Sequence, residues 1–484
     1  MFDDFFHRVS LVLLLAVTAC TTAFAQHKDS LNGRKIIISY IGIDGNDVTK
    51  TSVILRELSF KKGDTILATK WGEVALRSKN NVMNTGLFNF VDIDTLTSPL
   101  GETNVLIRVV EQWYIWPYPE FQIEERNFNV WWNQDHRSLQ KVDYGIFLSD
   151  NNTTGNKEIL RLKLQLGYTE QLGLSYTIPY ITKNQDIGIQ FNLNYSQNKE
   201  IAYTSIGNIL TFLSTPNATL QEQLTSAIDL TFRQGLYNIH YLEVNFASCN
   251  INDTLLKVTT NYLPFNLKST AFFGAKYYFK RDLRDYAPYP LHGYYFDFSL
   301  NDYGLMLALP KQQAFNITYL QSSIHKYGKI THKLFYSAEA EGKVSQNGGE
   351  PYYLQRGLGY SNDFVRGYEY YVVDGNNYAL LKGEVKYQLL NIPIINLPTQ
   401  QLPFLRKRQF NKTNFALYLT AFSDWGYVGN ADPNVVNNFL ADTPLWGKGV
   451  GIDIVTYYGI VLRAEYSFNQ LNQGGFYLHF LADM

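Results

Sequence analysis

An arginine lies within a long aromatic loop, whereas most of the surrounding sequence has the alternating pattern of β-strands. In SNDFVRGYEYYVVDGNNY, residues 361–378, Arg366 is followed by Gly367 and Tyr368. A guanidinium can bind a carboxylate through two parallel hydrogen bonds, which fixes a loop tip in one geometry. Glycine permits a tight turn or a close backbone approach, and a tyrosine can pack as a rigid wedge. We therefore expect Arg366 to anchor this loop on a carboxylate.

Two aspartates in the segments that follow are candidates for the partner. In NFALYLTAFSDWG, residues 414–426, Asp424 has the same strand parity as Thr420 and therefore faces the polar side. Asp453, in KGVGIDIV, has inward parity as well. We expect Asp424 to be the anchor, with Asp453 as the reserve candidate. The alternative is that Arg366 is an ordinary surface arginine in a tyrosine-rich loop.

No catalytic constellation stands out in the sequence. The eight histidines are scattered without a metal-ligand spacing, and neither a nucleophile motif nor a phosphate-binding loop is present. Asp282 and Asp285 flank Arg284, which favours a charged, mutually paired turn over acid–base chemistry. We expect no enzymatic activity, no cofactor and no metal.

The elements that would position these residues are strands. After Trp113 apolar and polar side chains alternate with a period of two, for example in residues 157–167, 187–195 and 380–389. Tyrosine and phenylalanine, which favour strands, number 36 and 31. We count about 16 strands, an even number as in bacterial single-chain barrels, and treat residues 201–222 as a loop or strand extension. The prediction is a mainly β fold.

A soluble sandwich alternates in the same way as a membrane barrel. An export signal, segments of about ten residues, and polar turns that alternate with longer Asn-rich or Gly-rich connections favour an antiparallel transmembrane β-barrel over residues 113–484. Residues 1–25 read as a signal peptide, with the apolar run LVLLLAV and cleavage expected after Ala25. The alternative is a lipoprotein box in which Cys20 is acylated. Cys249 would then have no disulfide partner in the chain.

Residues 33–111 have a mixed pattern in the order β-α-α-β-β, which indicates a small soluble α/β unit. This unit resembles a POTRA domain through Gly45 and Asn46 after the first strand, Gly63 and Asp64 between the helices, and Phe88 near the third strand segment. POTRA domains, as the family is described, bind unfolded chains by adding a strand to a sheet edge. The alternative is a spacer or cap.

Further motifs extend the resemblance over almost the whole mature chain. Val365, Arg366, Gly367 and Tyr368 match the lumen-loop signature of the BamA/TamA superfamily of outer-membrane barrels, which includes surface-antigen-type barrels, and residues 422–426 match its F-x-D-x-G strand motif. In that family the strand after the lumen loop is the twelfth of 16, and the motif aspartate partners the loop arginine. Five candidate strands follow the loop here, which agrees with that position. The lumen loop is expected near residues 347–375.

The resemblance implies a factor that inserts or exports polypeptides at the outer membrane of a Gram-negative bacterium, without nucleotide hydrolysis and with the POTRA domain in the periplasm. Implied partners are unfolded outer-membrane or secreted polypeptides, outer-membrane lipids and accessory lipoproteins. Nucleic acid is not expected, since the net charge is -1. The alternatives are a two-partner-type secretion pore and a passive or gated diffusion channel. The single POTRA unit and the C-terminus beyond Phe480 depart from the main assembly factors.

Overall fold

The computed structural model of the chain describes residues 34–97, 102–123, 126–182, 184, 186–215, 218–307, 315–346, 351–354, 356–361, 363–396, 412–429, 436–456 and 459–481. The predicted signal peptide with Cys20, and residues 347–350 of the predicted lumen loop, lie outside this part of the chain. Two compact units result: the first holds Met1–Asp47 and Thr51–Val110, and the second holds Val48–Lys50 and Glu111–Met484.

The first unit is a small sheet with two helices. Its elements are β1 (Lys35–Asp44), α2 (Thr51–Leu55), β2 (Thr65–Leu67), α3 (Ala68–Met83), β3 (Phe88–Thr97) and β4 (Glu102–Glu111). The sheet order is β2-β1-β4-β3, with β1 and β4 parallel. The short β2 was not predicted, because three residues are too few to show an alternating pattern. β3, which has ten residues, forms one edge of this sheet.

Apolar side chains of the sheet and helices form the core of the first unit. Ile38, Ile107, Val82 and Phe88 are all buried. The two glycines of the predicted motif lie at turns with positive φ, 90° at Gly45 and 93° at Gly63, a region that glycine enters without steric cost. At the second turn the Asp64 carboxylate accepts a hydrogen bond from the Lys61 N–H at 2.9 Å, and at the first Asn46 follows directly after β1.

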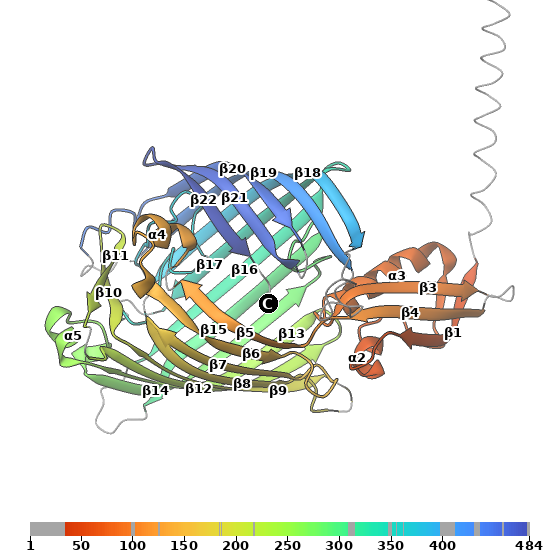
Figure 1. Ribbon diagram of the computed structural model, residues 1–484, viewed down its shortest axis with the longest axis horizontal. Helices are drawn as coiled ribbons and strands as arrows, with labels where there is room; N and C mark the ends of the chain where they lie inside the picture. Colours follow the sequence, from red (N-terminus) through yellow and green to blue (C-terminus); the bar gives the residue numbers. More distant parts are fainter. Residues whose placement is uncertain are drawn as a thin grey trace, which may run out of the picture. The chain divides into compact units, whose positions relative to one another are not determined.

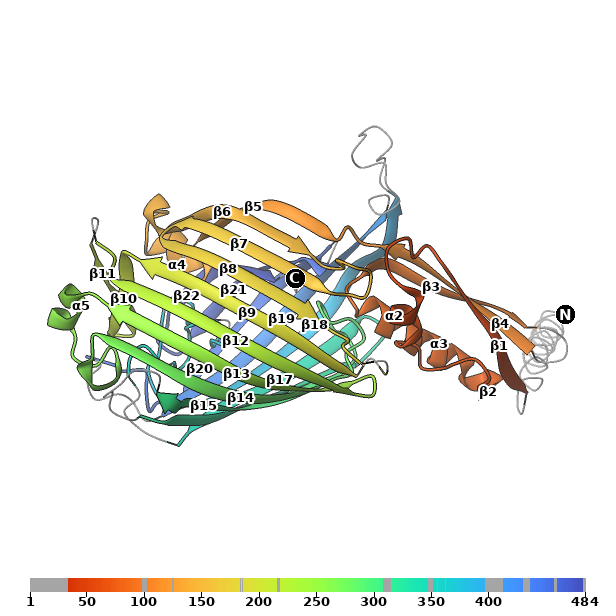
Figure 2. The ribbon, with the colours of Figure 1, turned by 90° about the horizontal axis from the view of Figure 1, so that it is seen from below.

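The second unit is an antiparallel sheet of 16 strands that curls into a barrel (Figures 1 and 2). Its strands are β5 (Ile115–Ile123), β6 (Val142–Asp150), β7 (Ile159–Gly167), β8 (Thr169–Ile178), β9 (Ile187–Asn198), β12 (Gln221–Gln234), β13 (Asn238–Ile251), β14 (Ser269–Asp282), β15 (Gly293–Leu307), β16 (Ile317–Lys329), β17 (Leu334–Ser345), β18 (Asn377–Asn396), β19 (Lys412–Gly429), β20 (Leu445–Val455), β21 (Val461–Asn469) and β22 (Gly474–Leu481). The mainly β fold class is therefore confirmed.

Several short elements lie in the connections of the barrel unit. They are α4 (Phe128–Asn133), η1 (Leu139–Lys141), β10 (Glu200–Ile206), β11 (Ile209–Ser214), α5 (Asp253–Val258) and η2 (Pro264–Asn266). β10 and β11 form a separate two-stranded sheet, with one isolated bridge from Ile206 to Val436, so residues 201–222, predicted as a loop or strand extension, contain a hairpin outside the barrel sheet. The even number of barrel strands follows from this.

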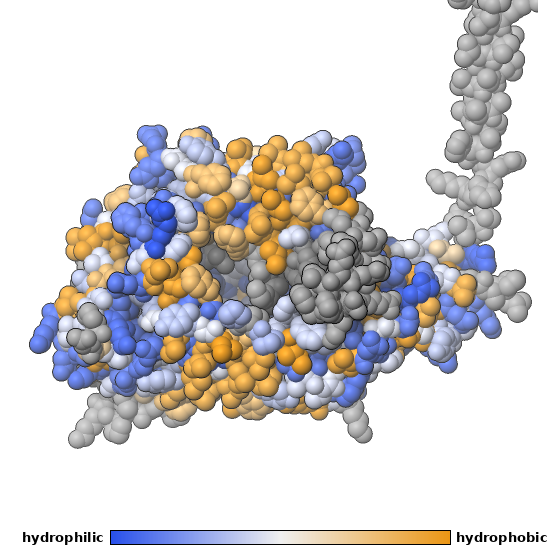
Figure 3. All heavy atoms as spheres, in the orientation of Figure 1, coloured by the Kyte–Doolittle hydropathy of each residue, from blue (hydrophilic) through white to orange (hydrophobic). Residues whose placement is uncertain are grey.

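The two faces of the barrel strands differ in chemistry. Leu162, Leu164 and Leu166 on β7 are exposed on the outside, whereas the intervening Gln165 is buried on the inside. Figure 3 shows apolar side chains gathered in bands over the strands. Such an outward apolar row is what lipid requires of a barrel wall. No helix among the described residues is long and apolar enough to cross a membrane.

The hydrogen-bonded order of the barrel sheet begins at β22 and ends at β5. Within the described part of the chain no backbone ladder joins these two strands. Instead α4, which follows β5 after four residues, contacts β22. The place where the sheet order ends, between β5 and β22, is called the seam below, and α4 lies against its β22 side.

Candidate functional site

The connection from β17 to β18 folds against the inner wall of the barrel and is called the lumen loop below. Its apolar residues Leu358, Val365 and Tyr368 are buried in one cluster with Val428 of β19 and Leu445 of β20. Tyr368, predicted to act as a wedge, is 3% exposed. Because β18 is the twelfth strand of the barrel sheet, the loop precedes the strand that the family resemblance indicated.

Arg366 of the lumen loop binds Asp424 of β19 in a two-point contact. Its Nε donates to Oδ2 and its Nη2 donates to Oδ1, each at 2.7 Å, and the Arg366 backbone N–H also donates to Oδ2 at 3.2 Å. Both residues are buried, with Asp424 fully excluded from solvent. The guanidinium carbon lies 3.7 Å from the centre of the Phe422 ring, which adds a cation–π contact. The loop tip is thus held in one orientation.

Glycines on the wall make room for the loop backbone. A Cβ added at Gly447 of β20 would lie 1.7 Å from the Arg366 carbonyl oxygen, and one at Gly426 of β19 would lie 2.5 Å from the Val365 side chain. Gly367 has a φ of 96°, which a residue with a Cβ rarely adopts. In residues 422–426 the phenylalanine, the aspartate and the last glycine therefore all face the loop tip.

A second arginine extends the charged contact along the wall. Glu384 of β18 accepts from Arg366 Nη1 through Oε2 and from Arg463 Nη2 through Oε1, both at 3.1 Å. Arg463 of β21 in turn donates to both oxygens of Asp453 at 2.8 Å. Tyr289, from the connection between β14 and β15, donates its hydroxyl to Asp453 at 2.8 Å. The result is a continuous network of two guanidiniums and three carboxylates.

Asp453 is not the anchor of the loop arginine. It lies on β20, where the register places it directly opposite Arg463 of β21, and this guanidinium takes both of its oxygens. Its inward parity agrees with the sequence-based expectation, but parity fixes a face and not a partner. Asp424, one strand nearer to the loop, is the aspartate that meets Arg366.

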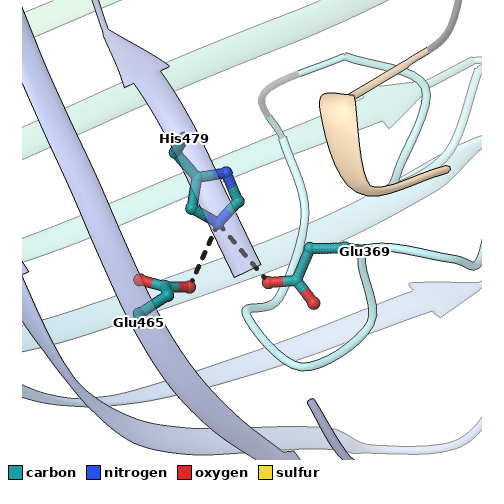
Figure 4. A group of neighbouring side chains, drawn as sticks. All are labelled: Glu369, Glu465 and His479. Carbon is teal, nitrogen blue, oxygen red and sulfur yellow. Dashed lines mark hydrogen bonds and ion pairs between the residues drawn. The ribbon is translucent and has the colours of Figure 1, made fainter. Parts of the chain in front are cut away.

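Glu369 of the lumen loop, Glu465 of β21 and His479 of β22 form a further buried group (Figure 4). His479 Nε2 lies 3.2 Å from Glu465 Oε1 and 3.8 Å from Glu369 Oε1. The Glu369 carboxylate accepts from the Gly367 N–H at 2.9 Å. Burial, together with the nearby charge of Glu465, raises the pKa of Glu369 to about 8. The group therefore binds a proton up to a higher pH than an ordinary carboxyl does.

Among the described residues, these three side chains form the group that could hold a metal ion, because their ligand atoms lie within 4.8 Å of one another. Two carboxylates and one imidazole suit a divalent cation. The Glu465 Oε1–His479 hydrogen bond and the raised pKa of Glu369 also favour a proton as the balancing charge, although Glu465 Oε2 is buried without a hydrogen-bond partner among the described residues. We therefore treat the group as a protonated loop contact.

The segment around α4 binds the lumen loop from the side of the seam. Arg126 donates to the backbone carbonyls of Gly359, Tyr370 and Tyr371 at 3.2, 3.1 and 2.8 Å. Asn127 Nδ2 donates to the Glu369 carbonyl at 2.8 Å. Sequence reasoning did not find these residues, because contacts to backbone carbonyls leave no spacing pattern.

The fold and the site together define a class: an outer-membrane-type β-barrel with a lumen loop anchored on its wall and a small α/β domain before it. Residues 36–112 match the family model POTRA, "Surface antigen variable number repeat". No curated protein matches the sequence.

Several solved structures are similar to this chain. CdiB from Escherichia coli is 12% identical with a TM-score of 0.54, and the alignment covers 94% of this chain and 78% of that chain. BamA from Haemophilus ducreyi lacking POTRA domains 1-3 is 16% identical with a TM-score of 0.49, covering 92% and 83%. CdiB from Acinetobacter baumannii is 14% identical with a TM-score of 0.42, covering 92% and 73%. Residues 36–112 therefore match the POTRA family, and the chain shares the POTRA-plus-barrel fold of CdiB from Escherichia coli, in agreement with the fold that the sequence motifs predicted.

Proposed function

We propose that this protein inserts polypeptides into the outer membrane, with the POTRA domain in the periplasm capturing unfolded clients. The observation that carries the proposal is the seam: β5 and β22 end the barrel sheet without a ladder between them in the described residues. An unpaired strand edge is a template on which another chain can form backbone hydrogen bonds. In hydrocarbon such pairing is strongly favoured, because unsatisfied backbone groups there are costly.

The first unit supports the same proposal through the edge strand of its sheet. β3 is ten residues long and stands at the end of the sheet order of the described residues, the position at which strand addition would take place. Leu96 of β3 is 79% exposed. A photo-crosslinking residue at position 96 is expected to capture unfolded barrel precursors. The matched control is position 76 on α3, also an exposed leucine (58%), which does not lie on a strand edge.

Backbone pairing and burial of apolar rows would drive the insertion, so nucleotide hydrolysis is not part of the proposal. Lipids of the outer membrane surround the barrel and contact its outward apolar rows, such as Leu162, Leu164 and Leu166. Accessory lipoproteins would bind on the periplasmic side.

Depletion of the protein in its own bacterium, followed by quantification of the outer-membrane proteome, tests the function. We expect several barrel proteins to fall together, because a general template does not depend on the client sequence. If one secreted polypeptide is lost while the barrel proteins stay at normal levels, the function is that of a secretion pore and not of an insertion factor. Normal levels of both, together with a large conductance in planar bilayers, would favour the diffusion channel.

A further inference from the structure

The edge of the last barrel strand is occupied by a side chain of α4. Asn129 Nδ2 donates to the carbonyl oxygen of Leu478 at 3.2 Å, and the Leu478 N–H donates to Asn129 Oδ1 at 3.0 Å. In an antiparallel sheet, two directly opposed residues of a hydrogen-bonded pair exchange the same two bonds. The amide of Asn129 therefore takes the place that one residue of a neighbouring strand would have on β22.

Packing of α4 against β22 fixes this amide. Asn129 and Val130 are buried, with 4% and 3% of their surface exposed. On the outer side, Phe128 packs edge-on against Phe480 of β22 with ring centres 6.0 Å apart. The side chain of Asn127 caps α4 by accepting from the N–H groups of residues 129 and 130. The short helix is thus held at the edge by contacts that an incoming strand would have to replace.

The same segment is also tied to the lumen loop. Arg126 and Asn127 donate four hydrogen bonds to backbone carbonyls of the loop, at Gly359 and at residues 369–371. A movement of α4 away from β22 therefore strains contacts with the loop, and a movement of the loop strains the cover of the edge. The lumen loop and the seam are mechanically connected through four consecutive residues, 126–129.

We propose that α4 is a latch that closes the pairing edge of β22, and that a client strand enters the seam by displacing the Asn129 amide from Leu478. The inference rests on the proposed function for the identity of the partner, an extended polypeptide segment. The closed edge itself does not depend on that function, since the bonds between Asn129 and Leu478 exist in the protein alone. The latch also protects an otherwise unpaired edge from unwanted association.

Hydrogen–deuterium exchange of the purified full-length protein in detergent tests the closed edge without any client. In Asn129→Ala the peptide covering β22 is expected to exchange roughly fivefold to tenfold faster at its protected edge amide, the effect of losing about one net hydrogen bond. Asn129→Asp keeps an acceptor for the Leu478 N–H and loses the donor, so we expect a smaller increase. The control Gln134→Ala changes the same helix at its C-cap and should leave β22 exchange at the wild-type rate.

A reversible covalent lock tests the role in client entry. Phe128→Cys with Phe480→Cys, joined by a cleavable bismaleimide in a Cys249→Ala background, holds the helix on β22. We expect insertion of a barrel precursor into proteoliposomes to drop at least tenfold and to return when the linker is cut. Trp131→Cys with Ser138→Cys, whose wild-type side chain and carbonyl are bonded at 2.9 Å within this connection, is the matched control and should insert precursor equally with and without the linker.

The outcomes separate the two ideas. Unchanged β22 exchange in Asn129→Ala, or full insertion through the locked pair, would overturn the latch. Faster exchange in Asn129→Ala, combined with no precursor insertion by the wild-type protein, would support the closed edge and contradict the proposed insertion function.

Discussion

Arg366 of the lumen loop and Arg463 of β21 bind opposite oxygens of a single carboxylate, that of Glu384. Each guanidinium also has an aspartate of its own, Asp424 for the first and Asp453 for the second. Like charges can share one carboxylate only when further acids balance them, and here three acids face two arginines. The loop is therefore held by a network in the wall and not by an isolated ion pair.

Removal of the loop guanidinium should release the loop while leaving the barrel folded. Arg366→Ala leaves Asp424 fully buried without its charged partner, and breaking a buried pair costs about 3–5 kcal/mol, which lumen water would reduce. We expect faster proteolysis within residues 351–376 and impaired client assembly, with normal heat-modifiable migration of the barrel. Arg366→Lys, which keeps the charge but loses the fork, should have a smaller effect.

The double variant Arg366→Ala with Asp424→Ala tests whether the two residues act as one contact. If they do, the double variant should be no worse than the single Arg366→Ala in loop proteolysis or in client assembly. Additive defects would show that each residue acts through a separate partner. Glu384 serves as the internal control. It binds both arginines, and its hydrogen bond from Arg463 should persist in every one of these variants.

Wall glycine 447 offers a steric test that removes no charge. In Gly447→Ala the new Cβ would overlap the Arg366 carbonyl oxygen, since the undisturbed distance is 1.7 Å, so the loop tip must shift. We expect an increase in loop proteolysis comparable to that of Arg366→Ala. Gly383→Ala on β18 is the control, because its nearest neighbour is the Ser423 carbonyl oxygen at 3.5 Å, an ordinary contact. Equal proteolysis in the two glycine variants would contradict the close-approach argument.

Removing the charge of Glu384, the carboxylate that both arginines share, should destabilise the protein less than Arg366→Ala does, but it should weaken two contacts and not one. Glu384→Gln leaves one carbonyl oxygen for two guanidiniums, so one of the two contacts at 3.1 Å is lost and the remaining bond is weaker. Hydrogen bonds to charged groups contribute about 1.5–3 kcal/mol, and we expect a loss of unfolding free energy in this range. Glu341→Gln on β17 is the matched control, because Glu341 accepts from the neutral Tyr378 and Gln321 side chains. Urea unfolding of both variants in detergent gives the comparison.

Much of this arrangement was predictable from periodicity. The alternation on β19 placed Asp424 on the inner face, and the motif spacing selected it as the arginine partner, which is where the structure puts it. Strand alternation in residues 380–389 also placed Glu384 on the polar face, where Arg463 of β21 binds it. It could not pair them, because which inner side chains meet depends on the stagger between strands and not on any one strand.

The seam was beyond sequence reasoning for a different reason. Asn129 lies in a six-residue helix within a connection, too short for a helical pattern, and its partner is the backbone of a strand some 350 positions later in the chain. The hairpin of β10 and β11 was ambiguous for a related reason: its segments alternate like barrel strands, although they form a two-stranded sheet apart from the barrel sheet.

The group of Glu369, Glu465 and His479 predicts that the lumen loop docks more weakly as pH rises. Burial and the neighbouring Glu465 raise the pKa of Glu369 from 4.5 to about 8 in the docked loop. The docked state thus binds a proton that the released loop gives up above about pH 4.5, so docking is strongest below that value and weakens until about pH 8. Above pH 8 two buried carboxylates repel each other beside a single imidazole.

Loop proteolysis between pH 5 and 9 measures this dependence. The wild-type loop should become steadily more susceptible, whereas Glu369→Gln, which keeps an acceptor for the Gly367 N–H and cannot ionise, should be nearly constant over the window. His479→Gln separates the contribution of the imidazole, and Arg366 remains charged throughout. A wild-type profile that is flat, or one that becomes more resistant as pH rises, would show that Glu369 is ionised in the docked loop and that a cation other than a proton balances the group.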